Sequence, residues 1–309
     1  MSHWSVLGSG VTGLCVATAL ADAGEKLEII TSEEHGPASY FAGGMLAPFC
    51  EGEGAPEDVV RLGQGSADWW QAHVSGVERQ GTLVIAPPRD SMELNRFARM
   101  TQGHEWVDPG SVEDRLAGRF ARGLFFPSEG HLDPRKAMQE LRQKLLAAGV
   151  AIHHGKATGK IIDCRGIHAA PLLPELRAVR GEMLILHSDE VQFSRPVRLL
   201  HPRFPCYLVP RSEGRFMLGA TMVESNDASS ISARALMELL SAAYTIDPAL
   251  AEARVIETGS GLRPSYPNNL PDIRYRDGTF HVNGMYRHGF LLAPIVAQNL
   301  IQQLSQETR

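Results

Sequence analysis

The sequence has no run of about 18 uninterrupted apolar residues, so no membrane-spanning helix is expected and no membrane association is predicted. It has no block of lysine or arginine, and its formal net charge is −5, which argues against a nucleic-acid-binding surface. It also lacks low-complexity tracts and repeats of solenoid length. The amino terminus lacks the basic start of a secretory signal, so the expected location is the cytoplasm.

Cysteine is scarce and scattered. The four cysteines, Cys15, Cys50, Cys164 and Cys206, lie far apart and form no CxxC pair. This spacing predicts neither a disulfide framework nor a metal site. Buried or inert thiols in a reducing compartment are expected instead.

The composition that remains is that of an ordinary globular protein, with 43% hydrophobic and 21% charged residues. A chain of 309 residues suggests about two domains, taking roughly 150 residues for each. Such a chain can bury a sizeable core without covalent cross-links.

A glycine pattern near the amino terminus predicts a dinucleotide site. Residues 4–7 read as a short strand, residues 14–23 as a helix ended by Gly24, and residues 27–31 as a second strand. Between strand and helix, Gly8, Gly10 and Gly13 fit the GxGxxG spacing, which allows a tight turn, close approach of a pyrophosphate and close packing of helix on strand. The strand before and the helix after give this otherwise weak motif its context. The predicted contacts here are Gly8, Gly10, Val11, Thr12 and Gly13.

One part of the dinucleotide fingerprint is missing. The acidic residue that usually ends the second strand and binds the ribose is replaced by Thr31. Either Glu33 turns back to the ribose, or Thr31 makes a neutral hydrogen bond. The predicted ribose contacts are therefore Thr31, Ser32 and Glu33.

Four further segments carry a resemblance to a known family. They are "ASYFAGGMLAPFCE" (38–51), "RGEMLIL" (180–186), "CYLVPRSEGRFMLGATM" (206–222) and "GSGLRPSYPNNLPDI" (259–273). The first is small, glycine-rich and nearly uncharged, so its backbone can lie against a flat ring. Together with the glycine turn, the set resembles the FAD-dependent D-amino-acid oxidase family, and within it the glycine oxidases of the thiamine pathway. The matches run in order from residue 4 to about residue 300.

The resemblance implies FAD as cofactor and an α/β and α+β fold. A Rossmann-like FAD domain would take residues 1–80, 131–180 and 258–309, and a mainly antiparallel substrate domain residues 81–130 and 181–257. Residues 81–88 and 214–222 read as strands, and residues 132–149 as a helix capped by Asp133. The segment 153–166 departs from the family because it leaves little room for the usual excursion of strands before the next flavin contact, here Gly166.

The resemblance also implies a substrate clamp. Arg263, in the GLRP-type motif, would hold a carboxylate through two charge-assisted hydrogen bonds. Without the family match, an interdomain salt bridge is the more common role for such an arginine. Tyr207 would give a second hydrogen bond to the carboxylate, although a tyrosine in an apolar strand usually belongs to the core. Met222 would line the pocket beside the ring, and Arg287 would lie near both ring and substrate.

The carboxyl-terminal helix, expected from Ala293 onward, would point its amino end at the flavin ring and favour the negative charge of the reduced form. The predicted cofactor contacts around the ring are Ala42, Gly43, Gly44, Met45, Arg287, His288, Gly289, Phe290 and Leu291. His288 has no assigned chemistry, and a polar loop histidine is the plain interpretation.

The activity implied is oxidation of glycine, or of a similarly small amino acid, by hydride transfer to flavin N5. Dioxygen would re-oxidise the flavin and yield hydrogen peroxide, and no protein acid or base is required. The imine would hydrolyse to glyoxylate or pass to a thiazole synthase, and a homo-oligomer stays open. The alternatives are an oxidase of sarcosine or small D-amino acids, a nicotinamide-dependent dehydrogenase, and a non-catalytic flavoprotein subunit. Thr31 and the short 153–166 segment favour the last, whereas Arg263, Tyr207 and Arg287 together speak against it, because a subunit without catalysis needs no carboxylate clamp.

Overall fold

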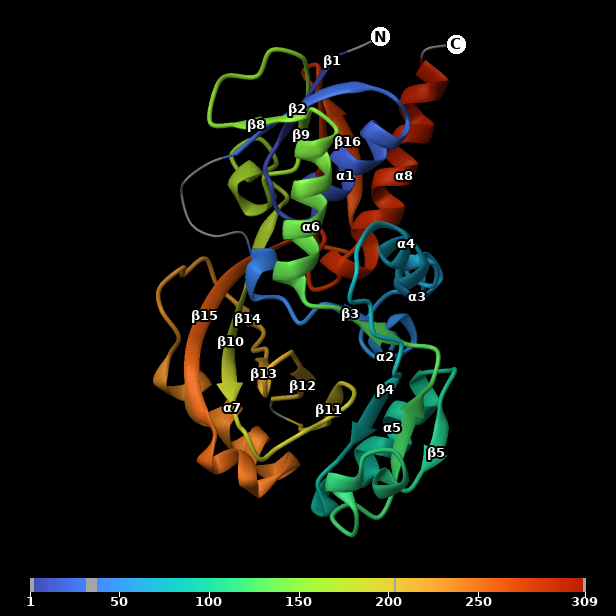
Figure 1. Cartoon of the computed structure of the whole chain (residues 1–309), viewed down its shortest axis with the longest axis vertical. Helices are drawn as coiled ribbons and strands as arrows, with labels where there is room; N and C mark the ends of the chain where they lie inside the picture. The colour runs from blue at the N-terminus through green and yellow to red at the C-terminus, as the bar shows by residue number, and fades with distance from the viewer. Residues whose placement is uncertain (1–2, 32–37, 203, 308–309) are drawn as a thin grey trace.

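The chain folds around two large β-sheets that lie one above the other in Figure 1. The structure is a computed structural model, and it describes residues 3–31, 38–202 and 204–307. The beginning of the chain and the end of its last helix lie at the same end of the molecule, beside the first sheet. No helix in these described ranges is long and apolar enough to cross a membrane.

The first sheet is assembled from three separate parts of the sequence. Its strand order is β16-β17-β9-β1-β2-β8, and all neighbours are parallel except β16 and β17. The strands are β1 (His3–Leu7), β2 (Lys26–Ile30), β8 (Ala151–His153), β9 (Lys160–Asp163), β16 (Asp272–Arg276) and β17 (Thr279–Asn283). Helices α1 (Val11–Asp22), α6 (Pro134–Ala147) and α8 (Gly289–Glu307) pack on this sheet and close its apolar core. This is the predicted Rossmann-like layer.

The second sheet is mainly antiparallel, with β4 and β11 as its parallel pair. Its strand order is β14-β10-β13-β12-β11-β4-β6-β5. Strand β15 pairs with β10 along the edge opposite to β13 and β14. The strands are β4 (Thr82–Ile85), β5 (Glu105–Val107), β6 (Gly123–Phe126), β10 (Arg177–His187), β11 (Val197–Leu199), β12 (Cys206–Pro210), β13 (Arg215–Gly219), β14 (Val223–Glu224) and β15 (Arg254–Ser265). Helix α7 (Ala233–Ile246) buries one apolar cluster of this sheet, and α5 (Met92–Met100) buries another. The predicted fold class is confirmed.

Short elements connect the two layers. The two-stranded pair β3 (Met45–Leu46) and β7 (Gly130–His131) lies between the sheets, followed along the chain by α2 (Pro48–Glu51), α3 (Glu57–Gly63) and α4 (Ser66–His73). Single 3-10 turns cover Ala38–Phe41, Pro88–Asp90, Pro109–Ser111, Asp114–Leu116, Gly166–Ala169 and Pro248–Glu252. The long strands β10 and β15 belong to the second sheet along their whole length, and they cross two of the predicted domain borders. Those borders stay a prediction.

The starts of two helices can be compared with those predicted from the sequence. The carboxylate of Asp133 accepts the backbone N–H of Arg135 at 2.9 Å and caps α6 as expected. The last helix begins at Gly289, not at Ala293, and the N–H of Leu292 already bonds to the carbonyl of His288 at 2.8 Å. The predicted start at Ala293 is therefore wrong, and the residues expected to form a loop beside the ring form the first turn of α8.

Candidate active site

A single elongated cavity of about 590 Å³ connects the glycine turn of the first sheet to the inner face of the second. One end is lined by Gly8, Gly10, Val11 and Thr12, and the opposite end by residues of β11, β12, β13 and β15. Segments 42–45, 164–168 and 285–291 line its middle. The cavity thus brings together segments that lie as far apart as residues 8 and 291.

The glycine turn leaves no space for side chains. A Cβ on Gly13 would lie 1.9 Å from the carbonyl oxygen of Gly8, and a Cβ on Gly8 would lie 2.9 Å from that of Cys164. Gly8 also has φ of +100°, which favours glycine. Helix α1 starts at this turn with its free N–H groups at the cavity, and that of Val11 donates to Ser39 Oγ at 3.1 Å. The turn therefore has the close packing that a pyrophosphate site requires.

The segment 42–45 is fixed by one glycine. Gly44 has φ of +69°, and a Cβ there would lie 2.2 Å from the carbonyl oxygen of Leu132. The backbone N–H of Leu132 donates to the carbonyl of Gly44 at 3.0 Å. All four predicted residues, Ala42, Gly43, Gly44 and Met45, line the cavity.

Of the residues predicted to contact the ribose, the one that the structure describes lies outside the cavity lining. The side chain of Thr31 contacts His154 Nδ1 at 3.0 Å, and Thr31 does not belong to the cavity lining. Ser32 and Glu33 lie outside the described residues. Gly166 does line the cavity, with φ of +59°, and its carbonyl accepts from Asn283 Nδ2 at 2.8 Å. The link between β8 and β9 holds no strand, as the short segment predicted.

The first turn of α8 enters the middle of the cavity. Gly289, Phe290 and Leu291 line it, with the free N–H groups expected at a helix start. Pro294 lacks the N–H that would bond to the carbonyl of Phe290. That carbonyl accepts instead from Trp70 Nε1 at 2.7 Å and Ser66 Oγ at 3.1 Å. The start of α8 is thus anchored to α4.

Arg263 reaches the far part of the cavity from β15. Its guanidinium lies over Gly181 of the neighbouring strand, where a Cβ would be 2.2 Å from Nη2. It donates to the carbonyl of Thr221 at 3.0 Å, and it forms no salt bridge with any carboxylate in the described part of the chain. Burial lowers the pKa of Arg263 to about 10, so the group is still charged at neutral pH. A charged donor without a protein anion is suited to a ligand carboxylate.

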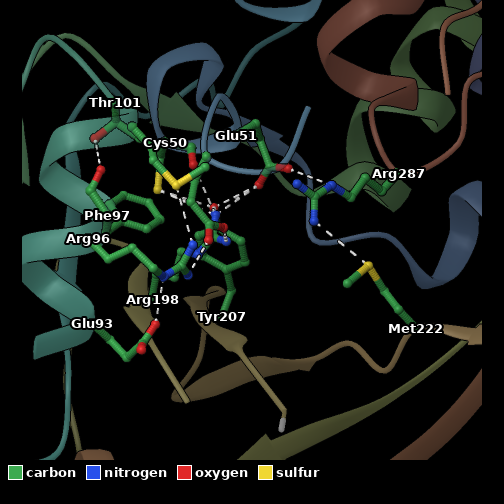
Figure 2. A network of polar contacts seen from close by, with 12 residues as sticks. Cys50, Glu51, Glu93, Arg96, Phe97, Thr101, Arg198, Tyr207, Met222 and Arg287 are labelled. Atoms are coloured by element: carbon green, nitrogen blue, oxygen red, sulfur yellow. Dashed lines mark hydrogen bonds and ion pairs between the residues drawn. The ribbon is translucent and has the colours of Figure 1, made fainter. Parts of the chain in front are cut away.

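Glu51, at the end of α2, is the centre of a buried ionic cluster (Figure 2). Its carboxylate accepts the Tyr207 hydroxyl at 2.7 Å and contacts Arg287 Nε at 3.0 Å and Arg198 Nη1 at 3.6 Å. His288 Nδ1 lies 3.6 Å away. Burial disfavours the charge of Glu51, but Arg287 and Arg198 outweigh it and hold its pKa at about 2. The carboxylate is therefore ionised, and Tyr207 is already bonded within the protein.

Strand pairing explains how this cluster forms. Arg198 on β11 lies directly opposite Tyr207 on β12, and its Nη1 donates to the Tyr207 hydroxyl at 2.9 Å. Behind the cavity, Arg198 Nη2 bonds to Glu53 at 3.2 Å, and Glu53 also pairs with Arg96 of α5. Cross-strand neighbours on one face lie within side-chain reach of each other, so the register alone places guanidinium and phenol together.

Met222 and Tyr286 form the outer wall. The side chain of Met222 is 47% exposed, and its sulfur lies 3.4 Å from the Tyr286 hydroxyl and 3.7 Å from Arg287 Nη1. Figure 2 shows Arg287 between Met222 and Glu51. Met222 therefore lines the cavity at its exposed side, and its place beside the ring stays a prediction.

Comparisons with known proteins agree with this arrangement. The model of the DAO family, described as FAD dependent oxidoreductase, matches residues 3–303. This chain belongs to the DAO family. A Rhizobium etli protein named as the thiamine biosynthesis oxidoreductase ThiO is 51% identical over 316 residues, covering 98% of this chain and 96% of that protein. The bifunctional protein ThiO/ThiG of Synechocystis is 28% identical, and the match covers 94% of this chain but 50% of that longer protein.

The fold also matches solved structures. Glycine oxidase from Bacillus cereus superimposes with a TM-score of 0.84 at 22% identity, over 99% of this chain and 98% of that one. At this identity the likeness shows the fold, and the roles of individual residues come from the geometry of this chain.

The cavity fits the dinucleotide that the DAO family uses. FAD needs a close phosphate approach at one end and a flat, side-chain-poor surface for its ring. The former is present at Gly8, where a Cβ would lie 2.9 Å from the Cys164 carbonyl, and the latter at Gly43 and Gly44. The residues that would hold it are the glycine turn, the 42–45 segment, Gly166 and the first turn of α8. When bound, the flavin would supply the acceptor for a hydride.

Sequence reasoning missed Glu51 and Arg198. Both had weak signals: Glu51 ends the quoted 38–51 segment as its one charged residue, and Arg198 interrupts the apolar run of residues 197–200. A charge within an apolar strand indicates a buried partner, but the sequence does not say which one. Tyr207, Met222, Arg263 and Arg287 were named and are brought together in one cavity.

Proposed function

We propose that this chain is an FAD-dependent oxidase of glycine, or of a comparably small amino acid, that serves thiamine biosynthesis. The observation that carries the proposal is Arg263. Its guanidinium is partly buried, has no carboxylate partner in the described part of the chain, and lies in the same cavity as the glycine turn and the start of α8. The name of the Rhizobium etli relative supports the pathway, and the substrate is inferred from the cavity itself.

In this proposal Arg263 binds the substrate carboxylate and turns the Cα–H bond toward the ring position. Bound FAD would supply the hydride acceptor and the route by which the two electrons reach dioxygen to give hydrogen peroxide. The imine takes up water to give glyoxylate and ammonia, or it is passed to a thiazole synthase. No residue of the cavity has to remove a proton from carbon, so catalysis rests on orientation and on the electrostatic field at the ring.

The ionic cluster gives the substrate little room. Glu51, Arg198 and Tyr207 line one wall of the cavity, and all three are bonded to one another. This supports a substrate without a long side chain. It does not separate glycine from sarcosine, because one methyl group changes binding by about 1–3 kcal/mol.

The experiment is a spectroscopic titration. The purified protein is expected to show a bound flavin, which glycine bleaches under anaerobic conditions, and to release one peroxide per glycine in air. Sarcosine, D-alanine and D-proline are compared at the same concentrations. Faster bleaching by one of these would change the substrate, and an intact flavin that no amino acid bleaches would show a non-catalytic flavoprotein and refute the proposal.

A further inference from the structure

The surroundings of Glu51 have the chemistry of an anion-binding site. Two guanidinium groups and one phenol converge on a carboxylate that is 7% exposed, from β11, β12 and the segment before α8. Figure 2 shows the Glu51 carboxylate between Arg287 on one side and the Arg198–Tyr207 pair on the other. Arginine pairs of this kind bind carboxylates whether the carboxylate belongs to a ligand or to the protein.

A count of the charged side chains distinguishes two anion positions in the cavity, one at Arg263 and one occupied by Glu51. Among the lining residues Arg165 is paired with Asp163 at 2.6 Å, which leaves Arg198, Arg263 and Arg287 as the remaining arginines. Glu51 and Glu53 oppose them, the latter from behind Arg198 and outside the cavity lining, and Arg96, which also contacts Glu53, is balanced by Glu93 at 2.9 Å. Three cations against two anions leave one positive charge. One ligand carboxylate, on Arg263, neutralises it.

We propose that Glu51 is a specificity-determining residue that acts as an internal carboxylate. It occupies the second anion position of the cavity, between Arg198, Arg287 and Tyr207, and so restricts the enzyme to amines with one carboxylate. A dicarboxylic amine would have to place its second carboxylate where Glu51 already lies. Buried like charges repel strongly, so that ligand is rejected. The substrate side of this proposal rests on the proposed function, whereas the anion position itself does not.

Truncation of Glu51 is expected to open the second position to a free carboxylate. The background is Arg263→Met, which removes the first position, and the probe is sodium acetate compared with sodium chloride at equal ionic strength. With Glu51 present, acetate is expected to leave the melting temperature of the holoprotein unchanged. In the Glu51→Ala, Arg263→Met double variant, 100 mM acetate is expected to raise it by about 2–4 °C. If acetate does not raise the melting temperature of the double variant more than chloride does, the proposal is overturned.

Three matched variants test position against net charge. Glu53→Ala, in the same Arg263→Met background, removes the other carboxylate on Arg198 but opens no space in the cavity, so acetate is expected to have no effect. An acetate effect equal to that of Glu51→Ala would show that charge alone decides, against the proposal. Glu51→Gln keeps the volume and is expected to stay insensitive to acetate. If Glu51→Ala does not fold, Glu51→Ser replaces it, because its hydroxyl leaves Tyr207 a partner.

Turnover provides the second readout, with Arg263 intact. Glu51→Ala is expected to shift the ratio of kcat/KM for iminodiacetate to that for glycine by about 100-fold toward iminodiacetate, the value of one charged hydrogen-bonded contact. Added acetate is expected to restore part of the glycine activity by refilling the position. An unchanged ratio would refute the selectivity. If no variant or wild type oxidises glycine but acetate still binds after Glu51 is truncated, the proposed function fails and the anion position stands.

Discussion

Glu129 offers a sharp test of the electrostatics beneath the site. It follows β6, is fully buried, and accepts the backbone N–H of Cys50 through Oε1 at 2.7 Å. Its other oxygen has no hydrogen-bond partner in the described part of the chain. Burial raises the pKa of Glu129 to about 8, since an ionised carboxylate there would lose its water. Glu129 therefore positions α2, and with it Glu51, best in its neutral form.

The size of the pH effect on stability follows from the difference between this pKa and the ordinary value of 4.5. Because the folded protein holds the proton more tightly than the unfolded chain, stability is greatest below pH 4.5 and is lost as the pH rises through 8. At 1.36 kcal/mol for each pH decade the full loss is about 5 kcal/mol. This is an upper value, because any local opening that rehydrates the carboxylate reduces it.

Glu129→Gln removes the titration and keeps an oxygen for the Cys50 N–H. Urea unfolding of wild type and variant is compared at intervals from pH 5 to pH 9. Between pH 5 and pH 8 the free energy of unfolding of the variant is expected to rise steadily relative to that of the wild type, by several kcal/mol in total. Above pH 8 the difference between the two is expected to stay constant. Glu105→Gln, an exposed site on β5, is the control and is expected to show no such gain. Parallel curves for Glu129→Gln and wild type across the whole range would refute the reasoning.

Three further predictions concern one end and the middle of the cavity. Arg263→Lys is expected to raise the KM for glycine about 100-fold with unchanged flavin content, because a point charge replaces a two-pronged donor; steady-state kinetics and the visible spectrum check it. Gly44→Ala is expected to cost about 2 kcal/mol or more and to lower flavin content, since its φ is +69° and Leu132 O blocks the Cβ. Trp70→Phe is expected to cost about 1 kcal/mol in urea unfolding by removing a donor to Phe290 O, and adding Pro294→Ala should recover part of it.

The cofactor end of the site was predictable because its signals are local. The Gly8–Gly13 spacing, the flanking strand and helix, and the cap at Asp133 each depend on residues within a few positions of one another. Such signals survive in the structure because backbone sterics enforce them: a Cβ at Gly13 would lie 1.9 Å from a carbonyl oxygen. The same holds for the positive φ at Gly44.

The start of α8 was mispredicted for a non-local reason. Pro294 favours a helix that begins at about Ala293, since proline is most often found in a first turn. The helix instead runs through Pro294 from Gly289, because Trp70 and Ser66, more than 200 residues earlier, supply donors to the carbonyl that the proline leaves free. Nothing near Pro294 in the sequence carries that information.

The substrate end depends on pairings that only the fold creates. Arg198 meets Tyr207 through strand register, and Glu51 reaches both from the end of a four-residue helix in the linking layer. Each side chain comes from a different segment, so each can change without disturbing the glycine turn. Sequence likeness that is strong at the cofactor motifs therefore identifies the redox chemistry better than the substrate. If the residue at position 51 decides how many carboxylates the cavity accepts, members of this fold can differ in substrate through one buried charge while their FAD motifs stay the same.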